Sequence, residues 1–333
     1  MKRLDGDWKR QARRAATAAG MLAGGSVLTT LGLSYYVAHV LTAPKRPRLT
    51  DAYVMTPFEM GADCEEVRFA PARGDYALHG WWFKRPETRR VIVGCHGFRG
   101  SKSELIGIAT LLWRAGFNVL LFDFHGHGAD IGTPVTLGYR ELQDFYGALD
   151  YVGQRVPDAA IGVIGFSMGA SIAIIGTARR PDVRCVIADS PFASHDAVVA
   201  HNIARVTHLS GTLIASLADV FLARRAGYHA SDVAPEREVA AIAPRPLLIV
   251  HGTEDETIPV AQALRVYAAA REPKELWLGQ GAGHCGTYFL DRPAYTRRAE
   301  AFFARHLSEA EADAAAVTAI AAPDDDEADE LAG

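Results

Sequence analysis

The sequence has few cysteines, no excess of positive charge and no evident internal repeat. Its four cysteines, Cys64, Cys95, Cys185 and Cys285, are far apart and form no CxxC pair, so neither a zinc ribbon nor a dense disulfide framework is indicated. Because 35 Lys and Arg residues stand against 39 Asp and Glu, the formal net charge is -4, and nucleic-acid binding is not expected. With 333 residues, 49% of them hydrophobic, the chain can bury one large, enzyme-sized core.

The N-terminal region joins a basic stretch to a long apolar run. Residues 15–41 contain no Asp, Glu, Lys or Arg. As a helix rising ~1.5 Å per residue they would extend about 40 Å, more than the ~30 Å of bilayer hydrocarbon. Six Lys or Arg residues precede them, so the positive-inside rule favours a cytoplasmic N-terminus and places the bulk of the chain outside the cytoplasm. We expect a basic cytoplasmic segment at 1–14 and an uncleaved single-pass transmembrane anchor at 15–42 in the cell membrane. A cleaved signal peptide and a buried core helix are the alternatives.

Beyond the anchor, the chain alternates short β-rich runs with longer helical patterns. Eight runs are strand candidates, from EEVRF at residue 65 to KELWLG at residue 274. This order predicts an α/β fold over 65–308, after a linker at 43–64, with a mostly parallel sheet covered by helices on both faces. Residues 193–243 separate two predicted strands and are too many for a simple crossover, so we expect a helical cap there. Residues 309–333 hold nine acidic residues and no base or aromatic, which predicts a disordered tail.

A serine between two glycines follows one of the predicted strands. The motif GFSMG, from Gly165 to Gly169, comes directly after the apolar run AAIGVI and before a predicted helix. A sharp strand-to-helix turn would expose the Ser167 hydroxyl, and the flanking glycines would relieve contacts that a Cβ would make. The dipole of the helix would favour a developing oxyanion. Ser167 is therefore the candidate nucleophile, with an ordinary turn serine as the alternative.

Two later segments supply a candidate base and acid. A serine hydroxyl is a weak nucleophile at neutral pH and needs a base within hydrogen-bond reach and an acid that orients the base. Asp255, in HGTEDETIP, and His284, in GQGAGHCG, each follow a predicted strand, as Ser167 does. Because the carboxyl ends of parallel strands share one edge of a sheet, we expect the three side chains to meet there. Glu254 or Glu256 as the acid, and His284 as a packing histidine, are the alternatives.

An oxyanion hole is expected where the segment GCHGFRGSK follows another strand. A turn at His96 and Gly97 can present the backbone N–H of Phe98 toward the serine, and Met168 supplies a second N–H. Gly97 permits the close approach. Both donors belong to the main chain, so replacing either side chain should matter less than losing the serine, the base or the acid.

Five motifs, HGFRG, DFHGHG, GFSMG, PRPLLIVHGTEDETIP and GAGH, together carry a resemblance to a known family. Over about residues 65–307 the chain resembles the α/β hydrolases, in their serine aminopeptidase-like, Bem46-type branch. The resemblance implies an α/β-hydrolase fold and assigns the nucleophile to Ser167, the acid to Asp255, the base to His284 and the oxyanion donors to Phe98 and Met168. One loop departs from the family, which often has D-x-R-G-x-G-x-S where this chain has DFHGHGAD.

Other polar side chains have both a functional and a structural interpretation. His125, His127 and Asp130 offer ligand types suited to zinc, but a glycine-rich rim loop is the simpler interpretation, and no metal is expected. Cys285 is interpreted as a bystander rather than a thiol nucleophile, because the nucleophile of this fold belongs at the strand-to-helix turn. In the cap, the apolar positions 213, 214, 217, 220 and 221 predict one helix face that packs on the body, lines an acyl pocket or touches a bilayer.

The sequence as a whole predicts a membrane-anchored serine hydrolase that needs no cofactor. The expected substrate is a small acyl ester, a thioester or a lipid, and the expected partner is the bilayer that holds the anchor. A peptidase of aminopeptidase type remains an alternative. A second alternative is a tethered, non-catalytic binding protein that keeps the fold, because fold does not fix function.

Overall fold

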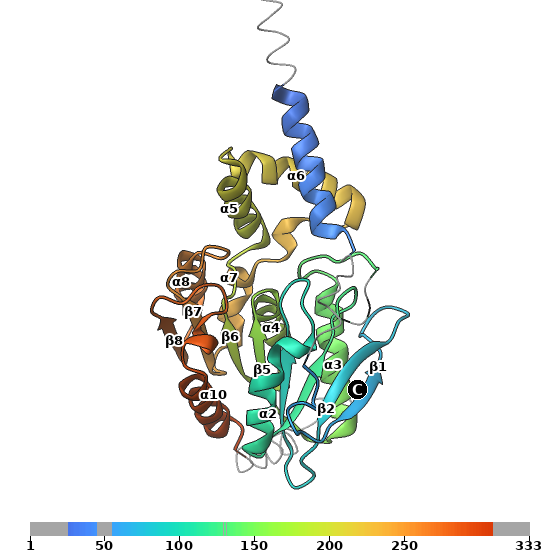
Figure 1. Ribbon diagram of the computed structural model, residues 1–333, viewed down its shortest axis with the longest axis vertical. Helices are drawn as coiled ribbons and strands as arrows, with labels where there is room; N and C mark the ends of the chain where they lie inside the picture. The colour runs from blue at the N-terminus through green and yellow to red at the C-terminus, as the bar shows by residue number, and fades with distance from the viewer. Residues whose placement is uncertain (1–25, 45–54, 129, 131, 309–333) are drawn as a thin grey trace, which may run out of the picture.

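A computed structural model of the chain describes residues 26–44, 55–128, 130 and 132–308 (Figure 1). The predicted cytoplasmic segment 1–14, the first part of the predicted anchor (15–25), residues 45–54 of the predicted linker and the predicted tail 309–333 lie outside the described residues.

The centre of the molecule is an eight-stranded sheet with the order β1-β2-β4-β3-β5-β6-β7-β8. The strands are β1 (Glu65–Phe69), β2 (Leu78–Phe83), β3 (Arg90–Cys95), β4 (Asn118–Phe122), β5 (Ala160–Phe166), β6 (Val183–Asp189), β7 (Leu247–Gly252) and β8 (Lys274–Gly279). Strand β2 is antiparallel to both of its neighbours, whereas β3 to β8 are parallel. The prediction of a mostly parallel eight-stranded sheet is confirmed.

Helices cover both faces of the sheet, which explains why its middle strands are almost continuously apolar. The helices of this body are η2 (Lys102–Leu105), α2 (Ile106–Arg114), α3 (Glu141–Arg155), α4 (Met168–Arg179), α8 (Val260–Ala269), α9 (Thr287–Leu290) and α10 (Arg292–His306). One core cluster joins α3, α4 and α8 to one face, with Phe145 and Val266 fully buried. The other joins α2 and α10 to the opposite face, through Leu112 and Phe303.

Between β6 and β7 the chain forms a helical insertion that rises above one edge of the sheet (Figure 1). It contains α5 (His195–Thr207), α6 (Gly211–Ala226), η3 (Ala230–Asp232), α7 (Pro235–Glu238) and η4 (Val239–Ile242). We call α5 and α6 the cap. Its helices lie close together at Gly211, where an added Cβ would be 1.9 Å from the carbonyl oxygen of Ala200.

The predicted apolar face of α6 differs from the face that the structure buries. The buried side chains are Ile214, Ala215, Ala218, Leu222 and Ala226, while Leu213 and Val220 are exposed. Because α5 approaches closely, the side of α6 that faces it has room for small side chains, and the alanines of α6 lie on that side. Two of the large apolar residues are thereby left outside.

A helix over residues 26–42 lies beside the cap, and in the view of Figure 1 its first turns extend beyond the cap at the top. It coincides with the second part of the predicted anchor. No helix in the described ranges is both long enough and apolar enough to cross a bilayer.

Candidate active site

Ser167 lies at the sharp turn between β5 and α4, with φ 54° and ψ -117°. A positive φ is rare for a residue other than glycine, and such strain is typical of a nucleophile at a strand-to-helix turn. Both flanking glycines are required, because at each of them a backbone carbonyl group of another residue lies too close to leave room for a Cβ. A Cβ on Gly165 would be 2.3 Å from the carbonyl oxygen of Gly169, and a Cβ on Gly169 would be 2.2 Å from that of Cys95. The turn can therefore form only with glycines on both sides of the serine.

The three predicted polar side chains meet beyond the ends of β5, β7 and β8. The Nε2 atom of His284 is 2.9 Å from the Ser167 hydroxyl, and its Nδ1 atom is 2.8 Å from Oδ2 of Asp255. A carboxylate can only accept, so Nδ1–H donates to Asp255 and the lone pair of Nε2 accepts from the serine. This geometry is that of a nucleophile, a base and an orienting acid; the catalytic roles themselves stay predictions.

The Asp255 carboxylate is held in place by backbone donors as well as by His284. Its Oδ1 atom accepts from the N–H groups of Thr257 at 2.9 Å and Ile258 at 2.8 Å. The fully buried His251 lies behind it, with Nε2 at 3.4 Å from Oδ2 of Asp255 and 2.7 Å from the carbonyl oxygen of Ile258. Burial lowers the pKa of His251, which favours its neutral form. Sequence reasoning missed this histidine, although it is the first residue of the motif HGTEDETIP and precedes Asp255 by four positions.

A second buried carboxylate, Asp189, supports the other side of the site. Its side chain accepts from the hydroxyls of Tyr295 and Ser190, each at 2.9 Å, and its carbonyl oxygen accepts from the N–H of Ser167 at 2.8 Å. The hydroxyl of Ser190 accepts in turn from the N–H of Cys285, next to His284, at 3.2 Å. Burial raises the pKa of Asp189 to about 7. Asp189 thus connects the serine turn to the histidine loop, a role that its sequence position alone does not indicate.

The predicted oxyanion loop is clamped by a buried histidine. The Nδ1–H of His96 donates to the carbonyl oxygen of Gly97 at 2.7 Å, and its Nε2 accepts from the N–H of Phe124 at 3.0 Å. Burial lowers the pKa of His96 to about 3, so the neutral ring keeps this tautomer. An added Cβ on Gly97 would be 3.5 Å from the Cβ of Ser167, so the loop passes directly against the serine.

The predicted oxyanion donors, Phe98 and Met168, border the same cavity as Ser167. Met168 is fully buried as the first residue of α4, where helix N–H groups point toward the turn. The role of Phe98 and Met168 as N–H donors to an oxyanion stays a prediction.

The cavity above Ser167 has a volume of about 450 Å³ and an apolar lining. It extends between α5 and the helix over residues 26–42, and Val198, Val199 and Ile203 of α5 form one side. None of the described residues that line it is Asp, Glu, Lys or Arg. A cavity of this size and character fits an apolar group attached to the atom that the serine would attack.

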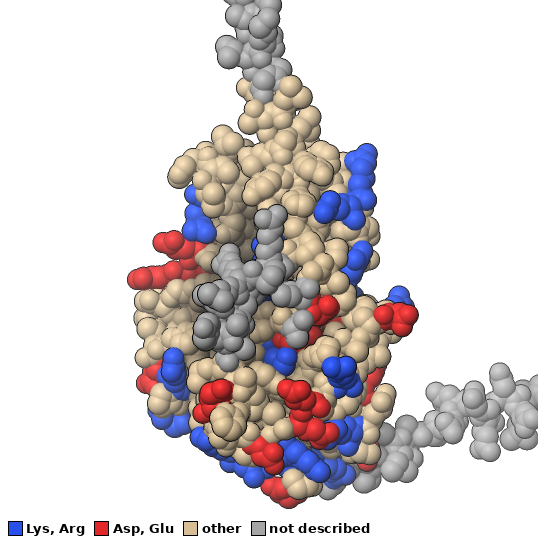
Figure 2. Space-filling model, turned by 45° about the vertical axis from the view of Figure 1, so that its right-hand side comes forward, with Lys and Arg blue, Asp and Glu red and all other residues tan. Residues whose placement is uncertain are grey.

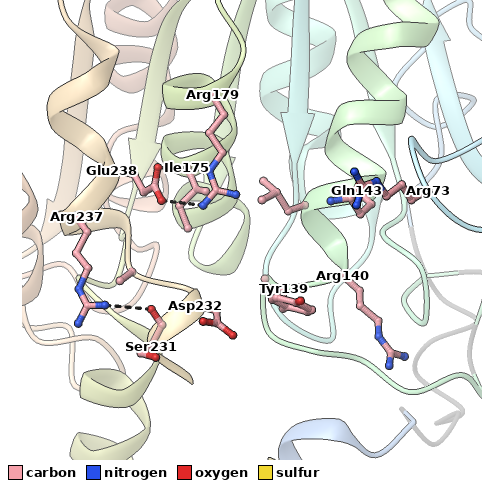
Figure 3. A pocket seen from close by; sticks show the side chains of 13 residues that line it. Arg73, Tyr139, Arg140, Gln143, Ile175, Arg179, Ser231, Asp232, Arg237 and Glu238 are labelled. Atoms are coloured by element: carbon pink, nitrogen blue, oxygen red, sulfur yellow. Dashed lines mark hydrogen bonds and ion pairs between the residues drawn. The ribbon is translucent and has the colours of Figure 1, made fainter. Parts of the chain in front are cut away.

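A second cavity, of about 700 Å³, differs in position and chemistry (Figure 3). Four arginines line it, Arg73, Arg140, Arg179 and Arg237, and none of the three residues Ser167, Asp255 and His284 does. Figure 3 shows Arg179 paired with Glu238, at 2.7 Å, on one side of the space. The first cavity, not this one, is therefore the site of any chemistry at Ser167.

The alternative acids remain apart from His284. Glu254 and Glu256 are exposed, and Glu256 pairs with Arg205 at 3.7 Å. Cys285 has its sulfur 3.8 Å from Nε2 of His284, but burial raises the pKa of its thiol well above the usual range, which disfavours a thiolate.

The two histidines of the loop DFHGHGAD, whose sequence differs from the family pattern, make structural contacts. His125 stacks on Tyr76 with ring centroids 3.9 Å apart, and its Nδ1 is 2.5 Å from Asp130. His127 is buried beside His96, at 5.2 Å between ring centroids. Within the described part of the chain, no three His, Cys, Asp or Glu side chains are placed to hold a metal ion.

Comparison with known proteins agrees with this architecture. A family model described as serine aminopeptidase, S33, matches residues 86–241. The uncharacterized protein YfhR of Salmonella typhimurium is 30% identical over 233 residues, which cover 64% of this chain and 72% of that protein. Protein bem46 of Schizosaccharomyces pombe is 24% identical over 265 residues, 77% of this chain and 83% of that protein. An esterase of Pyrococcus furiosus superposes with a TM-score of 0.66 at 25% identity, over 80% of this chain and 99% of the esterase.

Proposed function

The chain belongs to the α/β-hydrolase superfamily, in its serine aminopeptidase-like, Bem46-type branch, and on that premise we propose that it is a serine esterase that works through an acyl-enzyme. The observation that carries the proposal is the hydrogen-bonded line from Ser167 through His284 to Asp255. The membership itself supports a hydrolase. The ester as substrate, the roles of the three residues and the membrane association are the proposal.

The proposed reaction has two steps. His284 Nε2 takes the proton of Ser167 as Oγ attacks the acyl carbonyl carbon, and the protonated imidazole then gives that proton to the leaving alcohol. In the second step His284 takes a proton from water, the water attacks the acyl-serine, and Ser167 leaves with that proton as the free acid forms. Asp255 holds the ring in the required tautomer and stabilises the imidazolium. The N–H groups of Phe98 and Met168 stabilise the oxyanion of each tetrahedral intermediate.

The apolar cavity favours an acyl ester, thioester or lipid over a peptide with a free amino group. An aminopeptidase must bind a charged α-ammonium group, which is costly to bury without a carboxylate partner. The described lining of the cavity offers no carboxylate. The description of the matching family model makes an aminopeptidase the second candidate. An esterase and an aminopeptidase can be told apart by the substrate that the protein hydrolyses.

We further propose that the enzyme works at a membrane, as expected from the basic and apolar N-terminal sequence. Exposed apolar side chains gather on the helix over 26–42 and on the cap, and we call them the apolar rim. The apolar rim consists of Val27, Leu28, Leu31, Tyr35, Tyr36, Val206, Leu209, Leu213 and Val220. Figure 2 shows few charged side chains over this upper part of the molecule and many over the lower part. Exposed apolar side chains in this number, with few charges beside them, favour contact with lipid.

The proposed orientation has the N-terminus in the cytoplasm and the catalytic domain outside it. Alkaline phosphatase and a fluorescent protein, each fused to the C-terminus, should give an active phosphatase and a dark fluorophore. A fluorescent fusion with a silent phosphatase would contradict this orientation.

The esterase proposal is tested by comparing p-nitrophenyl butyrate with aminoacyl p-nitroanilides. We expect the full chain to hydrolyse the ester and Ser167→Ala to lose that activity at an unchanged melting temperature. Turnover of the anilides alone would favour the aminopeptidase. Turnover of neither, with folded protein, would favour a non-catalytic binding protein.

A further inference from the structure

We propose that the helix over residues 26–42 is one wall of the acyl-binding cavity and sets the length of acyl chain that the enzyme accepts. This inference rests on the proposed esterase function and adds its specificity. It gives the apolar N-terminal sequence a role in the active site, in addition to the proposed membrane contact.

One face of this helix is directed into the cavity above Ser167. The residues that line it are Leu33, Tyr36, Val37, Val40 and Leu41. They recur at i, i+3, i+4, i+7 and i+8, which is the spacing of a single helix face. Because nearly every residue of this segment is apolar or small, the face cannot be recognised from hydrophobicity alone.

The cavity leads from the serine into the space between this helix and the cap. Ser167, Met168 and Phe98 lie at one part of its lining, and Val206 of the exposed apolar rim lies at another. Its volume of about 450 Å³ is roughly fifteen times the ~30 Å³ that a water molecule occupies in the liquid. An acetyl group would fill only a small part of that volume, whereas a longer acyl chain would contact both walls.

The helix is fastened to the enzyme by specific contacts on two sides. Arg225 of α6 donates to the hydroxyl of Thr42 at 2.9 Å, and Tyr35 packs edge-to-face on Phe221, at 5.6 Å between ring centroids. On the other side, Arg99 donates to the carbonyl oxygen of Val40 at 2.6 Å. A guanidinium at the C-terminal end of a helix is favoured by the helix dipole as well as by the hydrogen bond.

The contact through Arg99 connects the helix to the catalytic machinery. Arg99 directly follows Phe98, one of the two predicted oxyanion donors, so the end of the helix is bonded to the oxyanion loop. Ser34 and Ala38, which lie between the cavity-lining positions in the sequence, are buried as well. A wall held in this way has a fixed distance from the serine, which is what chain-length selection requires.

The wall precedes residues 86–241, the part of the chain that the family model matches. Because the wall contains none of Ser167, Asp255 and His284, substitutions in it can alter chain-length preference without replacing any of these three residues.

The test measures kcat/KM of the full chain for p-nitrophenyl acetate and p-nitrophenyl octanoate, and compares their ratio between variants. Val37→Trp puts an indole ring into the cavity, and Leu28→Trp puts the same ring on the exposed side of the same helix. Each methylene that loses its apolar contact lowers kcat/KM about fourfold, so exclusion of two or more lowers the octanoate-to-acetate ratio at least about tenfold. The Leu28→Trp ratio should equal that of the wild type. Val37→Phe serves in the same way if Val37→Trp does not fold.

Three outcomes would contradict the account, and they are distinguishable. An unchanged ratio in Val37→Trp, or an equal fall in Leu28→Trp, would overturn the wall while leaving the esterase intact. Failure of the folded wild type to hydrolyse either ester would overturn the proposed function, on which the inference depends.

Discussion

Replacing Asp255 by asparagine tests how the carboxylate holds His284. In the wild type, Oδ1 accepts from two backbone N–H groups and Oδ2 accepts from Nδ1 of His284. An asparagine must keep its carbonyl oxygen toward the two backbone donors, because its NH₂ group cannot accept from them. The NH₂ group then faces Nδ1, which must become an acceptor. The proton moves to Nε2, where it blocks acceptance of the Ser167 proton.

The expected loss is large because the wrong tautomer removes general-base catalysis without disturbing the fold. In serine proteases the equivalent change lowers kcat about ten-thousand-fold, which corresponds to about 5 kcal/mol of transition-state stabilisation. We expect a loss of this order for p-nitrophenyl butyrate, with little change in melting temperature because the backbone hydrogen bonds are kept. The matched control is Glu254→Gln, the same chemical change at the exposed neighbour. Asp255→Asn within tenfold of the wild type, or an equal loss in Glu254→Gln, would refute the reasoning.

Two further predictions concern stability. In Gly169→Ala the new Cβ would lie 2.2 Å from the carbonyl oxygen of Cys95, so we expect a destabilisation of about 1–3 kcal/mol in thermal unfolding, and an unchanged melting temperature would contradict the close approach. Burial raises the pKa of Asp189 from 3.8 to about 7, so between these pH values the unfolded chain releases a proton that the folded chain keeps, and the free energy of unfolding falls as the pH rises. Because Asp189→Asn has no such proton, denaturant unfolding at pH 4.5 and pH 7.5 should show a smaller fall than in the wild type; equal falls would show that Asp189 does not titrate in this range.

The sheet could be predicted from the sequence because most of its strands are short apolar runs bounded by turn residues. All eight runs form strands. The middle strands are buried on both faces, which leaves little room for polar side chains, whereas the edge strands β1 and β8 carry charged residues at positions that are at least partly exposed. The proximity of Ser167, Asp255 and His284 could be predicted for a related reason. Each follows a strand, and parallel strands end at a common edge.

The supporting contacts of the site could not be predicted in this way. Asp189 and Tyr295 meet across 106 positions of sequence, and no local pattern separates this tyrosine from others in the chain. The inward face of α6 carries three alanines beside Ile214 and Leu222 where α5 approaches closely, whereas hydrophobicity alone selects the exposed Leu213 and Val220. The cavity-lining face of the helix over 26–42 could not be recognised either, because apolar residues also occur on its other sides.

The central claim is that Ser167 is an activated nucleophile, and covalent labelling by a fluorophosphonate probe tests it most directly. The account predicts one adduct per folded chain, assigned by peptide mass spectrometry to Ser167 and lost in Ser167→Ala. Equal labelling of the wild type and Ser167→Ala, or an adduct on another residue, would contradict it.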